Sequence, residues 1–478
     1  MVATTLPSND FRVIIVGGGI SGLVTALAAS RFGIRVDLYE RNTSIKELGA
    51  GVAIGPNAAA LLEKLSVGEV LDSISSRPVD RVNLIYRHHD TGEVGYTGKL
   101  NTAKRSFYCH RADFVRTIAS CLPSDQIHLG KSLKSISQDP HSVTAFFEDG
   151  TSVTASALIG ADGIRSKVRQ TWNQEKPIFS GQIVVRSLVK MAALPQDVQN
   201  YCKHGNVWVA PGKKHIVAYP IQRGKTVCAG AIIPAFGGKE WEESWKARDD
   251  EIDMANFMSA IEEFHTDPKT MFQLGESTSI FGLYEREPIT SWRNGRILLI
   301  GMQHMLCCPI KVCQGGSQAV EDAYVLGVLL AAASNSHTPG LNITNWFDVF
   351  EQIRKPRAEQ IAIESRAMGQ AFDDLQLSAE GVDFLRKSYS WVFITEALDE
   401  CEDQMKKSFG PNSVEWENLQ KILETSPCRE WTEDLSTWVS NPSQQNEHIV
   451  HYVHLKLVKE SLVTNYREVT NVDSGEVY

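Results

Sequence analysis

The stretch Phe11-Arg-Val-Ile-Ile-Val-Gly-Gly-Gly-Ile-Ser-Gly-Leu-Val-Thr-Ala-Leu-Ala-Ala-Ser30 contains the feature that decides the fold. Its β-branched run at residues 13–16 is typical of a buried parallel strand. Gly17, Gly19 and Gly22 follow directly with the spacing G-x-G-x-x-G, and apolar residues then recur at helical spacing. A strand, a glycine turn and a helix in this order predict the start of a dinucleotide-binding βαβ unit.

A second strand is predicted at residues 35–39 and ends in Glu40. Glu40 follows Gly17 at close to the roughly 20 residues expected for an acid that binds a ribose. Gly17 permits the tight turn, Gly19 lets the backbone approach a pyrophosphate, and Gly22 lets the helix pack on the strand. The amides at the helix N-terminus would bind the phosphates. No second such unit follows a later strand, so the chain is expected to hold one nucleotide permanently.

The composition predicts a globular protein that binds neither nucleic acid nor metal. The 478 residues carry a formal net charge of −9, whereas a nucleic-acid-binding protein would show a basic stripe. No run of 18 apolar residues occurs and residues 1–9 do not resemble a secretory signal, so we expect a cytoplasmic protein without a membrane span. Cys307, Cys308 and Cys313 match no zinc spacing, and we interpret them as free thiols in a reducing cytosol.

Two further blocks combine a strand with glycine. Residues 157–169 form a predicted strand that ends in Gly160-Ala-Asp-Gly163, followed by a sequence predicted to be helical. Asp162 could equally serve as the cap of that helix. Residues 294–301 form another predicted buried strand, and the glycine turn at residues 314–323 then opens a helix.

With these blocks, the chain resembles class A FAD-dependent aromatic monooxygenases, in particular the salicylate-hydroxylase-like group that includes fungal phenol hydroxylases of polyketide pathways. The resemblance spans about residues 10–405, and no known pattern is found from residue 411 onward. The matching blocks are Gly17–Gly22 with Glu40, Gly49–Asn57, His110-Arg111, Gly160–Gly163, Gly295–Asp322, and Arg354–Arg357 with Ser365 and Gly369.

The resemblance implies an α/β fold like that of para-hydroxybenzoate hydroxylase. A Rossmann-type FAD-binding domain would be interrupted by a mostly antiparallel β substrate domain and followed by a helical C-terminus. The expected parts are residues 10–177 and 291–370 for FAD binding, 178–290 for substrate, and 371–478 for a helical region with an uncertain tail. Strands are predicted at residues 181–186, 206–210 and 214–220, and a long helix at residues 345–371.

The resemblance also implies the reaction. NADPH would reduce FAD, the reduced flavin would react with O₂, and the resulting C4a-hydroperoxide would transfer one oxygen atom to a small phenolic or polyketide-like aromatic substrate. The protein would bind the phenol as phenolate, because a positive charge beside the phenol oxygen favours ionisation. A dry site would protect the reactive intermediate.

The same resemblance assigns the residues. Arg186 and Tyr219 would bind the phenolate as catalytic residues, as an Arg and a Tyr do in fungal phenol-dearomatising members. The alternative interpretations are a surface cation and a core tyrosine at strand ends. Arg111 would contact the flavin, or else lie on a helix surface, and the backbone of Ala53 would approach FAD. The residues assigned to the cofactor are Gly17, Gly19, Gly22, Glu40, Ala53, Arg111, Asp162, Gly163, Gly301, Gly315 and Gly316.

One block departs from the family pattern. After the strand that ends at Ile300 the family carries Gly-Asp, whose Asp binds the ribitol or ribose of FAD, then Ala-Ala-His and a Pro. Here Met302 occupies the Asp position, and Met cannot accept those hydrogen bonds. The segment between Gly301 and Gly315 is also one residue longer than the usual pattern.

Back-translation suggests an origin for this departure. When one G precedes the Met302 codon and the frame is shifted, permissible codons for residues 302–312 read Asp-Ala-Ala-His-Ala-Val-Leu-Pro-His-Gln-Gly, the missing family motif. The Asp, the first Ala and the Leu are then forced by the genetic code, and so is the third Ala when Leu306 has a CTN codon. We therefore hypothesise that residues 302–312 come from a wrong frame, through a sequencing or splicing error or a true frameshift, and that the frame recovers by Gln314.

Two alternative functions keep the same fold. A flavin halogenase would carry a W-x-W-x-I-P stretch and a membrane epoxidase would carry an anchor, and the sequence contains neither. A flavin-fold protein of different or lost activity is the second alternative, and the disrupted Gly-Asp motif at Met302 is its support.

Overall fold

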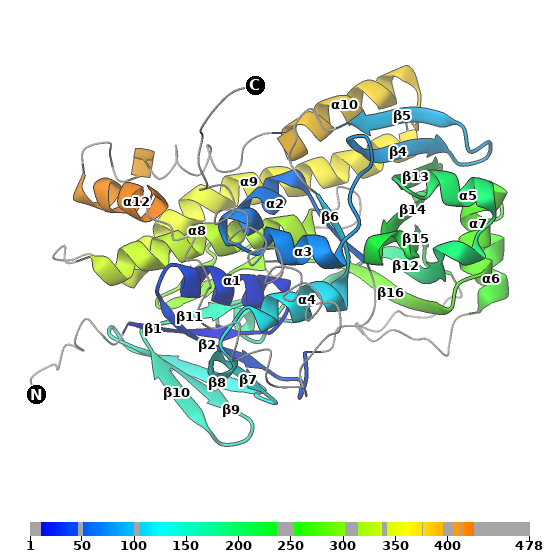
Figure 1. The fold of residues 1–478 in the computed structure, drawn as a ribbon. Coiled ribbons are helices and arrows are strands. Elements are labelled where there is room, and N and C mark those ends of the chain that lie inside the picture. The colour runs from blue at the N-terminus through cyan, green and yellow to red at the C-terminus, as the bar shows by residue number, and fades with distance from the viewer. Residues whose placement is uncertain are drawn as a thin grey trace, which may run out of the picture.

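The computed structural model describes residues 11–45, 51–99, 106–236, 253–301, 314–336, 342–374, 376–394, 406–408, 410 and 413–424. In these residues a six-stranded sheet and a seven-stranded sheet lie at opposite ends of the molecule, with long helices running between them (Figure 1). None of the helices described is both long and apolar enough to cross a membrane.

The six-stranded sheet forms the core of the N-terminal part. Its order is β17-β18-β11-β1-β2-β7, and all pairs are parallel except β17 with β18. The strands are β1 (Arg12–Val16), β2 (Arg35–Glu40), β7 (Ile127–Leu129), β11 (Ala157–Gly160), β17 (Arg293–Asn294) and β18 (Ile297–Leu299). Helices and a small three-stranded sheet pack on this sheet, so its apolar runs are buried.

Helices and small sheets surround this core. The helices are α1 (Ile20–Arg31), α2 (Pro56–Lys64), α3 (Gly68–Ile74), α4 (Arg111–Ser120), α8 (Gly315–Asn335), α9 (Ile343–Asp374), α10 (Ala379–Ile394) and α12 (Val414–Glu424). The small sheets pair β8 (Leu133–Gln138), β9 (Val143–Phe147) and β10 (Ser152–Ala155), and β3 (Gly51–Ile54) with β6 (Phe107–His110). Helix α8 packs on α1, where Gly327 contacts Ala28.

The seven-stranded sheet has the order β16-β12-β15-β14-β13-β4-β5 and is antiparallel except where β13 meets β4. Its strands are β4 (Val82–His88), β5 (Val94–Lys99), β12 (Ile178–Lys190), β13 (Gly205–Ala210), β14 (Lys214–Ile221), β15 (Thr226–Pro234) and β16 (Ser277–Glu285). The three strands predicted for this region are confirmed, with longer ends. Two further strands come from residues 82–99, far from the others in sequence.

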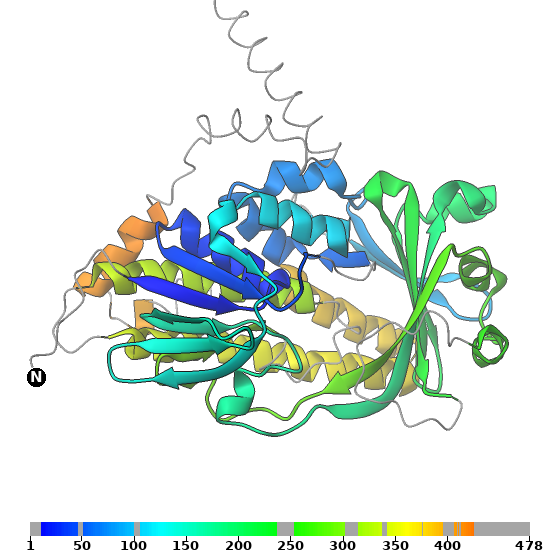
Figure 2. The same ribbon diagram turned by 90° about the horizontal axis from the view of Figure 1, so that it is seen from below.

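The two faces of this sheet differ, because successive residues of a strand point to opposite sides. One face, which includes Ile183, Val185 and Ile216, packs under α5 (Gln196–Tyr201), α6 (Met254–Ala260) and α7 (Thr266–Gln273). Figure 2 shows these short helices on the outer side of the sheet and the rest of the molecule on the other. The inner face therefore looks toward the six-stranded sheet and its helices.

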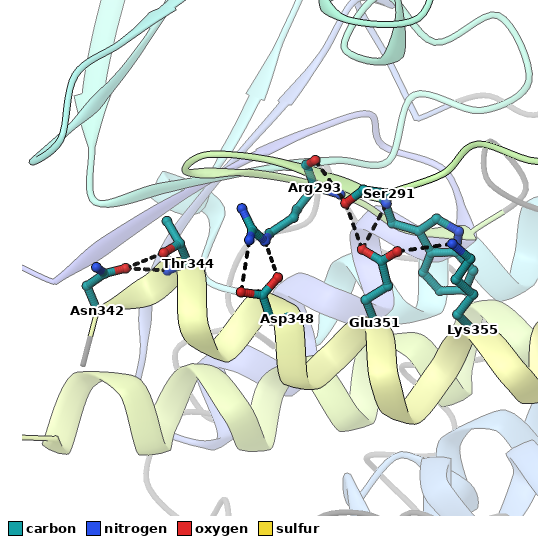
Figure 3. Close-up of polar contacts among 8 residues, drawn as sticks. Ser291, Arg293, Asn342, Thr344, Asp348, Glu351 and Lys355 are labelled. Atoms are coloured by element: carbon teal, nitrogen blue, oxygen red, sulfur yellow. Dashed lines mark hydrogen bonds and ion pairs between the residues drawn. The ribbon is translucent and has the colours of Figure 1, made fainter. Parts of the chain in front are cut away.

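Helix α9 confirms the predicted long helix, and residues in its N-terminal half make polar contacts with the segment before β18 (Figure 3). Arg293 pairs with Asp348, and Glu351 accepts hydrogen bonds from the Ser291 hydroxyl at 2.9 Å and from Lys355 at 3.2 Å. These contacts join α9 to the strand that leads to Gly301.

The helix predicted after Asp162 is wrong. Residues 161–168 form turns, and only a 3₁₀ turn at Arg169–Thr171 follows. Gly163 has φ +74°, outside the helical region. The Asp162 carboxylate accepts the amides of Lys167 and Val168 at 2.7 and 3.2 Å, so a local side-chain contact replaces the helical ladder.

Candidate functional site

The glycine turn after β1 has the geometry that a dinucleotide requires. Gly17 has φ +112°, and a Cβ there would overlap the carbonyl of Ala161. A Cβ at Gly22 would overlap the carbonyl of Gly17, so helix and turn pack with no space for a side chain. Gly19 is the N-cap of α1 and can offer no side-chain cap, which leaves the first amides of the helix for an anion.

Glu40 lies at the end of β2, beside the glycine turn. Its Oε2 accepts the amide of Gly18 at 2.7 Å, and its Oε1 accepts the amide and side chain of Asn42 at 2.9 and 2.7 Å. These bonds orient the carboxylate toward the start of α1. Oε2 has a further lone pair, so Glu40 can also accept from a ribose hydroxyl.

Asp162 also lies beside the glycine turn, since the position of a Cβ on Gly17 is 2.8 Å from the Asp162 amide nitrogen. Among the described residues, none donates to its buried Oδ1, while Oδ2 accepts two amides. Burial raises the pKa of this carboxyl above its ordinary value. An acceptor of this kind fits a ligand with hydroxyl groups.

Strand β3 and the start of α8 meet on the other side of this region. The Gly55 amide donates to the Ser317 hydroxyl at 3.0 Å. A Cβ on Gly316 would lie 3.0 Å from Ile54 Cδ1 and 3.2 Å from Val52 Cγ2, so this helix start lies against the strand that contains Ala53.

Gly301, which follows β18, lies beside the N-terminus of α1. It has φ +76°, and a Cβ there would overlap the Ser21 hydroxyl in the first turn of α1. Its amide donates to the buried carboxylate of Asp322 at 2.9 Å. The predicted cofactor residues from four distant segments thus converge between the N-termini of α1 and α8.

A buried ionic network supports this junction. The Glu321 carboxylate contacts Arg354 and Arg357, each at 2.8 Å, and Asp322 contacts Arg354 at 2.8 Å. Burial raises the pKa of Glu321, but the charges of Arg357 and Arg354 outweigh it and lower the pKa below its ordinary value. The side chain of Asn57 joins Glu321 at 2.6 Å, which connects α2 to the network.

Gln314 links this network to the turn before α8. Its side-chain oxygen accepts from Asn57 at 3.0 Å, and its backbone carbonyl accepts the amide of Gln318 at 2.8 Å. The two ends of the segment between Gly301 and Gln314 are therefore both bound to buried residues. Met302 and residues 302–313 lie outside the described residues.

Arg186 and Tyr219 lie on the inner face of the seven-stranded sheet. Both residues lie next to β15 in the sheet. Arg186 on β12 pairs with Gly230 of β15, and Tyr219 on β14 pairs with Cys228, which is two residues before Gly230 in β15. Both side chains keep partial exposure although their strands are internal to the sheet. The Arg186 guanidinium lies over the ring of Phe281, 5.1 Å from its centroid.

Arg111, at the start of α4, lies near Arg186. Burial, together with the positive charge of Arg186, lowers the pKa of the Arg111 guanidinium to about 10. Two predicted site arginines from separate segments therefore share one electropositive region. Such a region favours the ionised form of an acidic ligand.

Tyr219 also touches β3. A Cβ on Gly51 would lie 2.5 Å from the Tyr219 hydroxyl oxygen, and the Tyr219 and Tyr108 rings lie 5.5 Å apart. Ala53 packs in the same apolar cluster as Tyr219 and Cys228. The predicted substrate residues and the predicted cofactor strand therefore form one continuous site.

These residues fit FAD. The turn at Gly17 and the free helix start suit a pyrophosphate, Glu40 suits a ribose, and the small residues of β3 and α8 leave the backbone open to a flat ring. Asp162 contributes an unused acceptor. The structure brings the glycine turn, Glu40, Asp162, β3, Gly301 and the start of α8 close to one another. It places Arg111 near Arg186, and Tyr219 against β3. The roles of these residues in binding stay predictions.

Sequence reasoning missed several residues at this junction. Gly51 and Ser317 lie within the quoted blocks, and their glycine-rich surroundings were the available signal. Cys228 gave no signal, because its partners come from strands distant in sequence.

Comparison with known proteins gives the following matches. The sequence family described as FAD binding domain matches residues 10–365. 3-Hydroxybenzoate 6-hydroxylase of Klebsiella oxytoca is 31% identical over 398 residues, which cover 81% of this chain and 94% of that protein. 6-Methylsalicylate 1-monooxygenase atA of Aspergillus terreus is 28% identical over 377 residues, which cover 75% of this chain and 82% of that protein.

Among solved structures, a salicylate hydroxylase substrate complex shares the fold with a TM-score of 0.71 and 23% identity. The alignment covers 83% of this chain and 98% of that one. HpxO of Klebsiella pneumoniae, complexed with FAD and uric acid, has a TM-score of 0.67 and 23% identity. The alignment covers 82% of this chain and 96% of the HpxO chain.

Proposed function

Because the chain belongs to this family of FAD-dependent aromatic monooxygenases, we propose that it hydroxylates a small phenolic acid, held between Arg186 and Tyr219, with NADPH and O₂ as co-substrates. One observation carries the proposal: both side chains keep partial exposure on the sheet face that meets β3. The two sequence relatives named above are a 3-hydroxybenzoate hydroxylase and a 6-methylsalicylate monooxygenase, and both of these substrates combine a phenol with a carboxylate.

We assign two tasks to Arg186 and Tyr219: they bind the substrate, and they favour the deprotonated, phenolate form of its phenol. A guanidinium stabilises the phenolate, and the Tyr219 hydroxyl donates a second hydrogen bond to the same oxygen. An ionised phenol is richer in electrons at the ring carbons that react. FAD, when bound, supplies the activation of O₂ that no side chain can provide.

Apolar neighbours would keep water from this site. Val184, Ile232 and Phe281 are buried beside Arg186 on the inner face. A low-water environment strengthens the attraction between Arg186 and a phenolate. On the cofactor side, we assign Glu40 to a ribose, the amides after Gly19 to the pyrophosphate, and β3 with the start of α8 to the flavin ring.

Substrate-dependent NADPH oxidation tests the proposal. Purified protein with FAD should oxidise NADPH faster when 3-hydroxybenzoate, salicylate or 6-methylsalicylate is added. Mass spectrometry should then show a product one oxygen atom heavier than the substrate. Absence of both effects across the phenolic acids, in a protein that binds FAD, would reject the proposed activity.

The segment at Met302 needs its own comparison. We propose that the chain as given binds FAD less tightly than a version in which Gly-Asp-Ala-Ala-His-Ala-Val-Leu-Pro-His-Gln-Gly precedes Gln314. The Asp would restore an acceptor, and the segment would regain the length of the family pattern. Equal FAD affinity and equal turnover in the two proteins would contradict the frame hypothesis.

We also propose the domain division given above, with residues 82–99 added to the substrate sheet. Cytosolic location is our inference from the free cysteines Cys109, Cys121, Cys202 and Cys228, because oxidising compartments favour disulfides.

A further inference from the structure

Cys228 lies where the substrate sheet meets the strand assigned to the flavin. It pairs with Tyr219 across β14 and β15, on the inner face that also carries Arg186. Its thiol accepts the backbone amide of Gly51 at 3.2 Å and hydrogen-bonds the Tyr219 hydroxyl. The side chain is almost fully buried, at 4% exposure.

Gly51, Tyr219 and Cys228 are in mutual contact. The Tyr219 hydroxyl occupies the space where any side chain at position 51 would begin. Gly51 is also the first residue of β3, two residues before Ala53. A change in the position of Tyr219 is therefore transmitted directly to β3, and Cys228 holds both groups.

Sulfur is a weak hydrogen-bond acceptor compared with oxygen. The Tyr219 hydroxyl can therefore leave the thiol for a phenolate at little cost, because a bond to a charged oxygen is stronger. The partly buried Gly51 amide, in contrast, keeps the thiol as its acceptor.

We propose that Cys228 is a positioning residue, which holds Tyr219 against β3 until a phenolic substrate takes over the tyrosine hydrogen bond. The substrate half of this inference rests on the proposed function. The cofactor half depends only on the contact between Cys228 and Gly51.

The cofactor half is tested by equilibrium binding of FAD to the apoprotein. Cys228→Ala leaves the Gly51 amide without an acceptor and should weaken FAD binding about three- to tenfold. Cys228→Ser restores an acceptor and should stay within about twofold of wild type. Cys202→Ala is the matched control, because Cys202 is a buried cysteine in the apolar cluster on the outer face. It should leave FAD affinity unchanged.

The substrate half is tested by steady-state kinetics with the hydroxybenzoate that most stimulates wild-type NADPH oxidation. The serine hydroxyl of Cys228→Ser is a stronger acceptor and competes with the phenolate, so KM should rise about threefold or more while kcat changes less than twofold. If Cys228 only stabilised the fold, Cys228→Ser would not change KM more than kcat.

Three outcomes would overturn the inference. These are wild-type FAD affinity in Cys228→Ala, an equal loss in Cys202→Ala, and an unchanged KM in Cys228→Ser. If no phenolic acid stimulates NADPH oxidation by the wild type, the proposed function fails. The FAD affinities of the Cys228 variants still show whether the contact between Cys228 and Gly51 supports cofactor binding.

Discussion

Adjacent residues of β12 meet two different environments in the seven-stranded sheet. Ile183 and Val185 are fully buried under α5–α7. Arg186 and Leu188, on the inner face, keep partial exposure opposite β3. The outer face stabilises the sheet by apolar burial, whereas the inner face carries the three residues that we assign to the site, Arg186, Tyr219 and Cys228. A substitution at Ile183 should therefore change mainly the stability of the protein, and one at Arg186, three residues later, mainly its activity.

The largest effect is expected on the outer face. Ile183→Ala removes buried methyl groups and leaves a cavity, so the free energy of unfolding should fall by about 2–5 kcal/mol. Denaturant titration measures this loss. The folded fraction should keep the wild-type KM, and a changed KM would show that the two faces are not independent.

Arg186→Ala should have the next largest effect, on activity alone. Loss of a charge-assisted bond to a buried phenolate costs about 1.5–3 kcal/mol, a ten- to hundredfold drop in kcat/KM. Flavin content should not change. Arg186→Lys is the matched control, which keeps the charge but loses the planar fork and should recover only part of the activity. Wild-type turnover in Arg186→Ala would remove this residue from the site.

Tyr219→Phe should reduce kcat/KM about tenfold, near 1.4 kcal/mol, because Arg186 still stabilises the phenolate. The ring remains packed on Tyr108, so thermal stability should change little. The measurement is NADPH oxidation with the best phenolic acid. An effect larger than that of Arg186→Ala would reverse the assigned order of the two residues.

The smallest effect concerns Asp113, where α4 meets the turn after β14. Burial raises its pKa, but hydrogen bonds from His110 and Arg116 outweigh burial and lower the pKa to about 2. A depressed folded pKa adds stability above the ordinary value of 3.8, and this stability is lost as pH falls toward 2.

Partial exposure limits that contribution to roughly 1 kcal/mol or less. Thermal unfolding between pH 5 and pH 2.5 should show a smaller acid-dependent loss in Asp113→Asn than in wild type. Identical pH profiles for the two proteins would show that Asp113 does not stabilise this junction.

The sequence predicted the parts of the fold that depend on local pattern. The run at residues 13–16, the glycine spacing and Glu40 together indicate one βαβ unit, because strand, glycines, helix, strand and acid follow one another in the order of that unit. The long helix through Arg354 was expected from the family resemblance. The helix after Asp162 failed, since a carboxylate that accepts two nearby amides competes with the helical ladder.

By itself, then, the sequence determined the nucleotide turn, three strands of the seven-stranded sheet and the residue types suited to a phenolate. Only the tertiary structure decided that Arg186 and Tyr219 share the inner face, that residues 82–99 join their sheet, and that Cys228 connects Tyr219 to Gly51. The physical reason is that strand pairing and side-chain contacts join segments that are distant in sequence. A local pattern shows which residues alternate along one strand, but not which partner lies across from them.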